Sequence, residues 1–207
     1  MQRLLKRTVD ALASAMLLAF LLPLLAAIAV AILVTMGRPV FFRQSRSGRN
    51  GVRFTLLKLR TMAEGFDIEG SPLRDGARLT QLGGWIRTSS LDELPQLWNV
   101  LRGEMSLVGP RPLLPQYLDR YSHFQRRRLE VLPGITGWAQ IHGRNALAWE
   151  PRFQFDIWYI DHWSLWLDFR ILARTLVSVV KRQGINAGEH STMPEFQGRS
   201  VDHLKAG

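Results

Sequence analysis

Residues 11–36 read ALASAMLLAFLLPLLAAIAVAILVTM, and this apolar stretch decides how the rest of the chain is arranged. Apart from Ser14 and Thr35, each of its residues is apolar or small. As a helix it is long enough to cross a hydrocarbon core of about 30 Å. The apolar region of a signal peptide spans only about 7–15 residues before a small-residue cleavage site and polar sequence. The sequence therefore predicts an uncleaved membrane segment.

Basic residues lie on both sides of this segment, and positively charged flanks favour the cytoplasm. Both ends are then expected on one side, which suits a re-entrant helix-break-helix better than a straight span. Pro23 lies near the middle, where its missing N–H and its ring would break a helix. The alternative is an ordinary, kinked span. The flanking cations are Arg3, Lys6, Arg7, Arg38, Arg43, Arg46, Arg49, Arg53, Lys58 and Arg60.

The chain has 207 residues, enough for one small domain and an anchor. We expect an anchor over residues 1–37 and a cytoplasmic, membrane-facing domain over residues 38–207. The 27 Lys and Arg against 17 Asp and Glu, a net charge of +10, predict anionic partners: nucleic acid, acidic lipid or a phosphorylated substrate. No cysteine is present, so disulfides and thiolate chemistry are excluded. A metal would need oxygen or imidazole ligands, which suits magnesium.

The pattern after the anchor predicts a small α+β domain. Two short strands, residues 40–42 and 52–56, enclose the turn-rich residues 45–51, and residues 62–76 form an acidic loop. Leucines at helical spacing predict a helix over residues 91–101 that ends at Gly103. Residues 105–108 resemble a strand. Further helices are expected over residues 112–129, from Trp149 to a break at residues 161–164, and over residues 165–182.

Two adjacent carboxylates, Asp92 and Glu93, are the strongest candidates for chemistry. They lie at an expected helix start, where negative charge is stabilised. An Asp can attack phosphorus and hold the phosphoryl group covalently, and a neighbouring Glu can handle protons or support a metal. The competing interpretation is a capping box, in which Ser90 and Glu93 cap the helix and have no catalytic role.

Several cations could bind phosphate. Arg111 stands between two prolines, whose rigidity suits a guanidinium that grips phosphate. Lys58, Arg87 and Arg144 are further candidates, although each is individually more typical of a surface cation. The chain has no Walker loop, dinucleotide-binding glycine motif or nucleic-acid-binding motif, and its histidines lack metal-ligand spacing. Phosphate binding would therefore come from scattered side chains.

Aromatic residues gather around the last two predicted helices. They suit a membrane interface, where a helix rich in Leu, Val, Arg and Lys gains from burial and from anionic lipid. The alternative is an aromatic core. The residues concerned are Trp158, Tyr159, Trp163 and Trp166.

Three segments together resemble a known family: SLDELPQLWNVL (residues 90–101), GEMSLVGPRP (103–112) and PGITGWAQ (133–140). They are similar to the bacterial sugar transferases, and more closely to the small monotopic polyprenyl-phosphate phosphoglycosyl transferases. The resemblance implies that a UDP-sugar gives its sugar phosphate to Asp92 and releases UMP. Undecaprenyl phosphate then accepts it on the cytoplasmic face of the bacterial inner membrane, and magnesium is the implied cofactor.

Carried over by position, the resemblance makes Asp92 the nucleophile and a magnesium contact, Glu93 its acid/base partner, and Arg111 a diphosphate ligand. Four further residues are implied as substrate contacts: Lys58, Arg87, Arg144 and Asp168. The family commonly has Ser before the hairpin proline, whereas Leu22 stands here. The re-entrant segment therefore needs another partner for its broken backbone.

The donor sugar does not follow from any motif. The tail at residues 188–198 resembles members that initiate bacterial protein N-glycosylation, which implies UDP-N,N′-diacetylbacillosamine, with UDP-GlcNAc or UDP-GalNAc as alternatives. The expected partners are the UDP-sugar, undecaprenyl phosphate and anionic lipid, without nucleic acid, and homodimer formation is left open.

Two other functions compete with this one. The first is a non-enzymatic basic adaptor at the membrane, binding acidic lipid or nucleic acid. The second is a glycosidase, which needs two carboxyls about 5 Å or more apart on opposite sides of a sugar, a poor match for sequence neighbours.

Overall fold

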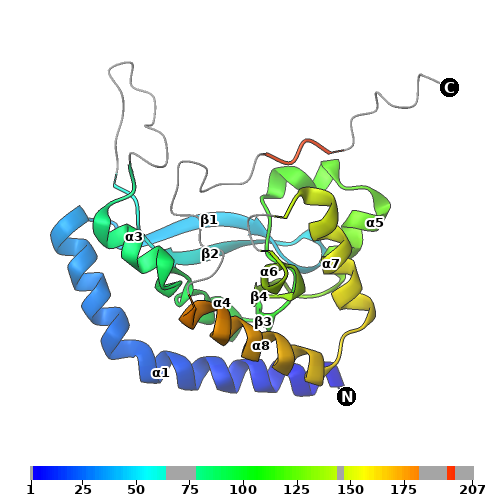
Figure 1. Ribbon diagram of the computed structural model, residues 1–207, viewed down its shortest axis with the longest axis horizontal. Helices are drawn as coiled ribbons and strands as arrows, with labels where there is room; N and C mark the ends of the chain where they lie inside the picture. The colour runs from blue at the N-terminus through cyan, green and yellow to red at the C-terminus, as the bar shows by residue number, and fades with distance from the viewer. Residues whose placement is uncertain (1, 64–77, 144–146, 182–194, 199–207) are drawn as a thin grey trace.

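The computed structural model describes residues 2–63, 78–143, 147–181 and 195–198. Its first element, α1 (Gln2–Met36), is a helix of 35 residues that contains Pro23. Figure 1 shows α1 running along one side of the molecule and then bending sharply toward α3 (Gln81–Thr88). A proline removes a helical hydrogen bond and crowds the preceding turn, which kinks a helix. The predicted helix-break-helix is thus one bent helix, not two separated ones.

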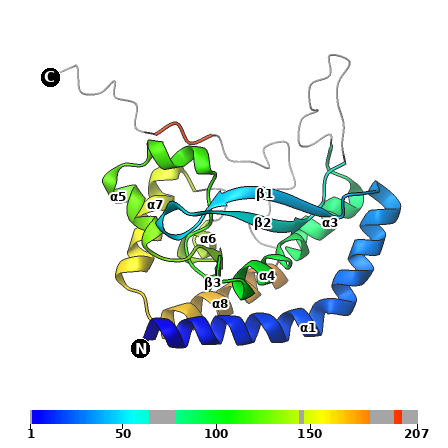
Figure 2. The same cartoon turned by 180° about the vertical axis from the view of Figure 1, so that it is seen from behind.

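The predicted hairpin is confirmed, with longer strands than expected. β1 (Phe41–Ser47) and β2 (Arg53–Leu59) pair antiparallel, with Phe41 opposite Leu59 and Ser47 opposite Arg53. A short 3-10 turn, η1 (Arg49–Gly51), joins them, and Asn50 and Gly51 both have positive φ there. Figure 2 shows the hairpin extending across the middle of the molecule from beside α3 and the C-terminal end of α1.

The predicted helix over residues 91–101 is divided. η2 (Leu91–Glu93) is a 3-10 turn, and α4 (Gln96–Leu101) begins after Pro95, which has no N–H to continue the hydrogen bonds of η2. The predicted stop is confirmed: Gly103 has φ +81°, and its N–H donates to Val100. The strand expected next is β3 (Ser106–Val108), which pairs parallel with β4 (Gly134–Thr136).

The predicted helix over residues 112–129 is wrong. The chain instead forms η3 (Pro115–Arg120), α5 (His123–Arg126) and η4 (Arg127–Glu130). Tyr121 is extended, and Ser122 starts α5 with a capping box to Gln125, so the backbone turns there. This turn brings Tyr117 and Tyr121 into a buried aromatic cluster.

The last helices are confirmed within the described residues. α6 (Trp138–Ile141) precedes α7 (Trp149–Asp161), and α8 (Leu165–Val180) follows the expected break, where the Ser164 side chain accepts from Leu167 N–H. The predicted acidic loop, apart from residues 62 and 63, lies outside the described residues, as do residues 182–194.

The main hydrophobic core joins β2, α4, β3, α7 and α8. Tyr159 belongs to this core with 2% of its surface exposed, so its predicted place at a membrane interface is wrong. Trp158 stacks on Trp138 with ring centres 4.5 Å apart, whereas Trp166 is 71% exposed. The aromatic group is therefore divided between core and surface.

The C-terminal end of α1 is fixed to the domain. Ile28 and Ile32 are buried in a small cluster with side chains from β2 and α3. The Arg60 guanidinium donates to the carbonyl oxygens of residues 36–38, where the helix ends. The last carbonyls of a helix have no partner within it, so Arg60 satisfies groups that would otherwise need water.

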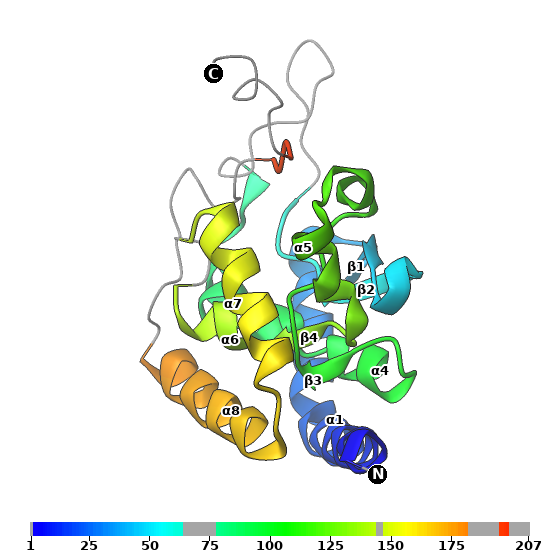
Figure 3. The same ribbon diagram turned by 90° about the vertical axis from the view of Figure 1, so that its right-hand side faces the viewer.

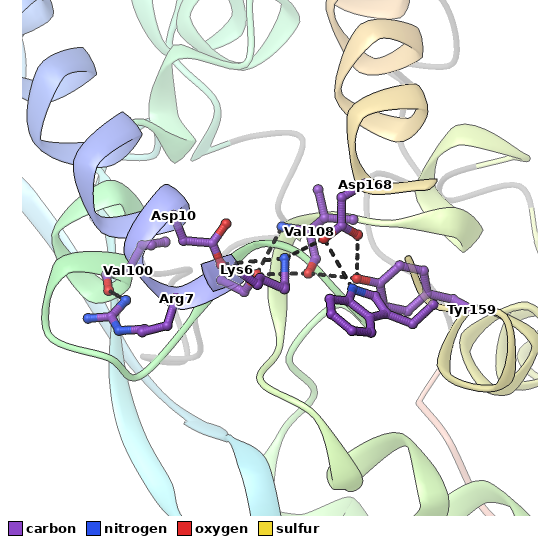
Figure 4. Close-up of polar contacts among 9 residues, drawn as sticks. Lys6, Arg7, Asp10, Val100, Val108, Tyr159 and Asp168 are labelled. Carbon is purple, nitrogen blue, oxygen red and sulfur yellow. Dashed lines mark hydrogen bonds and ion pairs between the residues drawn. The ribbon is translucent and has the colours of Figure 1, made fainter. Parts of the chain in front are cut away.

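The N-terminal end of α1 is fixed by a buried polar network (Figure 4). Lys6 Nζ donates to Asp168 Oδ2 at 2.6 Å and lies 3.4 Å from Asp10 Oδ2. Asp168 also accepts from the Tyr159 hydroxyl at 2.7 Å and from the Trp163 indole at 3.2 Å. The network thus joins α1 to the start of α8 and the end of α7.

Two further contacts strengthen this attachment. The Ser106 hydroxyl donates to Asp10 Oδ2 at 2.7 Å, which links α1 to β3. The Arg7 guanidinium donates to the carbonyl oxygens of Val100 and Leu101, at the C-terminal end of α4. Both ends of α1 are therefore held by the same domain.

We expect the Lys6→Met variant to be less stable by about 3–5 kcal/mol, because it leaves two buried carboxylates without their shared cation. The free energy of unfolding of the detergent-solubilised chain, measured by denaturant titration, checks this. The matched control is Arg3→Met, which removes an exposed cation from the same helix and should change stability by less than about 0.5 kcal/mol. Equal stability of the two variants would contradict the role of the network.

Candidate active site

The acidic pair lies on a tight turn between α3 and α4. Ser90 adopts a left-handed conformation with φ +58°, and its side chain makes no capping hydrogen bond. The alternative interpretation of this segment as a capping box is therefore wrong. The Glu93 side chain is not directed back to the backbone but contacts cations. Asp92 is 8% exposed.

Two cations hold Glu93. Its Oε1 accepts from Lys58 Nζ at 2.7 Å and from Arg111 Nη2 at 2.8 Å. Lys58 Nζ also lies 3.5 Å from Asp92 Oδ2, so one ammonium group bridges both carboxylates. Four of the predicted site residues, from β2, η2 and the loop after β3, thereby meet in one cluster.

The surroundings drive the pKa values of the two carboxylates apart. Burial raises the pKa of Asp92, partly opposed by the charge of Lys58 and reinforced by that of Glu93. Burial also acts to raise the pKa of Glu93, but the charges and hydrogen bonds of Arg111 and Lys58 outweigh it and hold that pKa well below the usual carboxyl range. Glu93 is thus a fixed anion, which favours orientation of the cations over proton transfer.

Asn99 on α4 positions these residues relative to the hairpin. Its side chain accepts from the Leu57 N–H at 3.2 Å and donates to the Thr55 carbonyl at 2.8 Å. It is 1% exposed, and it satisfies two backbone groups on the outer edge of β2. Lys58, the next residue on β2, is thereby held beside the turn that carries the acidic pair.

The loop that carries Arg111 is held by close backbone packing. A Cβ atom on Gly109 would lie 2.4 Å from the Leu132 carbonyl oxygen, and one on Gly134 would lie 2.1 Å from Gly109 N. Two of the three sequence segments singled out above meet at this crossing. Their glycines are explained by the close approach of two chains, not by contact with a ligand.

Arg128 supports Arg111 from behind. Its guanidinium donates to the Arg111 carbonyl at 2.7 Å and pairs with Asp156 at 2.8 Å, with both side chains buried. Arg111 itself is flanked by Pro110 and Pro112. The predicted rigidity of this arginine therefore comes from the two prolines and from a buried ion pair.

Two arginines beside Arg111 were missed by sequence reasoning. Burial, reinforced by the nearby charge of Arg111, lowers the pKa values of Arg46 and Arg152 to about 10 each. Both remain charged at neutral pH. Arg46 Nε is buried without a hydrogen-bond partner among the described residues. Arg46 lies in β1 and Arg152 in α7. Neither residue belongs to a motif or a spacing that would indicate a place in the site.

The remaining predicted residues differ in their position. The Arg87 guanidinium donates to Thr61 at 2.9 Å, and its charge acts on Asp92, so it belongs to the cluster. Asp168 lies in the separate network with Lys6, where its carboxylate accepts from Lys6 and from the Tyr159 hydroxyl. Its predicted contact with substrate stays a prediction. Arg144 lies outside the described residues.

The cluster can perform one kind of chemistry well. A buried carboxylate with a raised pKa lies next to a second carboxylate that stays ionised, and the nearby cations outnumber them. Such surplus positive charge stabilises an anionic group and the charge that develops on a departing phosphate. The cations whose charge acts on the pair are Arg46, Lys58, Arg87 and Arg111, and Arg152 adds charge near Arg111.

Comparisons with known proteins agree with the three sequence segments. Residues 1–182 match the family described as bacterial sugar transferase. An uncharacterized sugar transferase of Bacillus subtilis, EpsL, is 49% identical over 195 residues, covering 94% of this chain and 96% of that protein.

Relatives with assigned names are also similar. A UDP-glucose:undecaprenyl-phosphate glucose-1-phosphate transferase of Caulobacter vibrioides is 43% identical over 84% of this chain and 69% of its own length. A UDP-galactose-lipid carrier transferase of Erwinia amylovora is 40% identical over 88% of this chain, which spans 42% of that protein.

The tail at residues 188–198 lies beyond the matched region, so the predicted likeness to an initiator of protein N-glycosylation stays a prediction. The match itself covers α1, the acidic pair and the Arg111 loop in one alignment. By its sequence over residues 1–182, the chain belongs to the bacterial sugar transferase family.

Proposed function

We propose that this protein transfers a sugar phosphate from a UDP-sugar to undecaprenyl phosphate and releases UMP. The observation that carries the proposal is the buried acidic pair, Asp92 and Glu93, surrounded by an excess of cations. The names of the Caulobacter vibrioides and Erwinia amylovora relatives support the same reaction class.

In the first step, a carboxylate oxygen of Asp92 attacks the phosphorus atom that bears the sugar. An Asp–O–P bond forms, the P–O bond to UMP breaks, and UMP leaves with the electron pair. In the second step, a phosphate oxygen of undecaprenyl phosphate attacks the same phosphorus. The new P–O–P bond releases Asp92 as a carboxylate. Splitting the transfer in this way replaces one difficult step by two easier ones.

The cations would bind the diphosphate of the donor. Lys58 and Arg111 already contact Glu93, and this anion keeps both side chains aligned before the substrate arrives. Arg46 and Arg152 add charge next to Arg111. Preorganised cations of this kind offset the negative charge that accumulates on the departing UMP.

Magnesium fits these residues as a shared ligand of protein and substrate. Among the described residues, no group of three or more His, Asp or Glu side chains could hold a metal. Magnesium is usually held by one or two carboxylates together with substrate phosphates and water. Within the described chain, Asp92 has a single polar side-chain contact, at 3.5 Å, so its buried carboxylate retains the capacity to bind a cation. Bound there, magnesium would neutralise diphosphate charge.

We also propose that α1 enters the cytoplasmic leaflet of the bacterial inner membrane and returns to the same side. It is long and apolar enough to span, and only 11% of its most apolar window is buried. A straight helix of 35 residues would be about 50 Å long. Instead, both ends of α1 are bound to one domain: Lys6 contacts Asp168 at the first end, and Arg60 contacts the Met36 carbonyl at the other. These contacts support a re-entrant path. The bend of α1, a helix that contains Pro23, lets both ends reach this domain although Leu22 stands where the family commonly has serine.

The last helix supports an orientation at the membrane surface. Figures 1 and 3 show α8 and the first part of α1 along the same face of the molecule. On α8, Trp166, Phe169 and Leu176 are exposed, as are Arg170 and Arg174. Exposed apolar side chains interleaved with arginine suit an interface with anionic lipid.

The identity of the sugar on the UDP-sugar donor is a separate question. The names of the relatives contain glucose and galactose, whereas the tail resemblance predicts N,N′-diacetylbacillosamine, GlcNAc or GalNAc. Release of UMP from each UDP-sugar of this panel, with and without undecaprenyl phosphate, would identify the donor.

We expect Asp92→Asn to lose UMP release by at least about a thousandfold, because the amide cannot form the Asp–O–P bond. Mass spectrometry of the wild-type chain with UDP-sugar alone should show a phosphosugar adduct on Asp92. The control Asp119→Asn alters an exposed carboxylate and should form the adduct normally. Wild-type protein that releases no UMP from any UDP-sugar would instead indicate the adaptor function.

The acid limb of the first step should lie above the usual carboxyl range of about 4, because burial raises the pKa of Asp92 and its protonated form is not a nucleophile. Lys58→Met removes the main cation that lowers this pKa, so the limb should move to higher pH. Lys58→Arg should keep it near the wild-type position. The pH dependence of UMP release checks both, and a downward shift in Lys58→Met would contradict the assignment.

Both ends of α1 should be labelled from the same side of the membrane. Single cysteines at residues 3 and 38, introduced separately into this cysteine-free chain, would be tested with a membrane-impermeant maleimide in inverted and right-side-out vesicles. Both positions should react in inverted vesicles. Labelling of one position in each vesicle type would indicate a spanning helix.

A further inference from the structure

An apolar pocket of about 300 Å³ lies between α1 and the domain. All ten side chains that line it are apolar. On one side they come from the middle of α1, including Leu22 and Ala26. On the other they come from β1, β2, α4 and the residue before α4, including Pro95 and Trp98. We call this the α1–α4 pocket.

The α1–α4 pocket adjoins the candidate active site through two elements. Leu57 and Leu59 line it, while Lys58 between them contacts Asp92 and Glu93. Alternate residues of a strand point to opposite faces, so β2 presents the pocket on one face and the site on the other. Pro95, which also lines the pocket, follows Glu93 by two positions. The strand therefore lies between the pocket and the site, and a ligand with an apolar chain and a phosphate would contact both by passing beside Pro95.

The position of the pocket limits what could fill it. It borders the part of α1 that carries exposed apolar side chains, with Leu22 62% and Leu24 40% exposed. A polar, water-soluble ligand would make few favourable contacts there. Its volume is at the lower end of the range for ligand sites, about 300–1,000 Å³. A long chain would therefore be held over a short segment, with the remainder in the bilayer.

We propose that the α1–α4 pocket binds the isoprenoid units nearest the phosphate of the lipid acceptor. This inference rests on the proposed function, and it adds the place where the acceptor chain is held. Burial of these units would direct the acceptor phosphate toward Asp92, and it would discriminate a polyprenyl phosphate from a phosphate with a short chain. Bilayer acyl chains are the competing occupant.

A matched pair of variants tests the pocket. Ala26→Trp fills it, whereas Ala27→Trp adds the same side chain at the next, exposed position, which does not line it. With Ala26→Trp we expect adduct formation from UDP-sugar to be unchanged and the KM for undecaprenyl phosphate to rise by about tenfold or more. The KM for a phosphate with two isoprene units should change less. Ala27→Trp should match the wild type throughout.

Equal KM values for undecaprenyl phosphate in the two variants would overturn the inference while leaving the proposed function intact. Absence of the adduct in the wild type would instead remove the proposed function.

A second measurement does not depend on whether Ala26→Trp folds. Wild-type protein would be photolabelled with a polyprenyl phosphate that carries a diazirine on its first isoprene unit. Labelling should fall on the side chains that line the pocket, and undecaprenyl phosphate should compete with it whereas phosphatidylglycerol should not. These side chains are Leu18, Leu22, Leu25, Ala26, Ala29, Phe41, Leu57, Leu59, Pro95 and Trp98. Labelling confined to other residues, or equal competition by phosphatidylglycerol, would overturn the inference.

Discussion

The arrangement of this protein depends on one constraint: both ends of its 35-residue apolar helix are fixed to the same small domain. At the first end, Lys6 is shared by the buried carboxylates of Asp10 and Asp168, and at the other Arg60 binds the final carbonyls of the helix. A straight helix of this length could not meet both contacts on a compact domain, so α1 must bend, and it contains a proline. Its exposed apolar side chains then lie beside the domain, which is where a lipid substrate would arrive.

The same packing sets the charge of the candidate active site. Arg7 on α1 donates to carbonyl oxygens at the C-terminal end of α4. Asn99 on α4 in turn hydrogen-bonds to the edge of β2. Lys58 is thereby brought to Asp92 and Glu93. Glu93 neutralises only part of the surrounding positive charge, and burial makes the remaining charge costly without an anion. A diphosphate would supply a further anion for these cations, which links the charge of the site to the proposed reaction.

The family segments have two physical roles. Asp92, Glu93 and Arg111 contribute charged groups, whereas Gly109 and Gly134 allow two backbones to cross at a distance that any Cβ would prevent. Arg128 and Asp156 then hold the Arg111 carbonyl from a buried position. Residues of the second kind never touch the acidic pair, yet they fix where Arg111 meets Glu93.

The sequence alone determined the features that depend on local pattern: the apolar helix, the hairpin, the last two helices, the stop at Gly103 and the carboxylate pair. It failed where distant contacts prevail. Residues 112–129 form short turns because Tyr117 and Tyr121 pack into an aromatic cluster. Arg46 and Arg152 join Arg111 from other parts of the chain, and Asp168 binds Lys6 across 162 positions. Hydrophobic periodicity and helix-ending residues act over a few neighbours, whereas the neighbours of a buried charge are chosen by packing, so only the tertiary structure decided them.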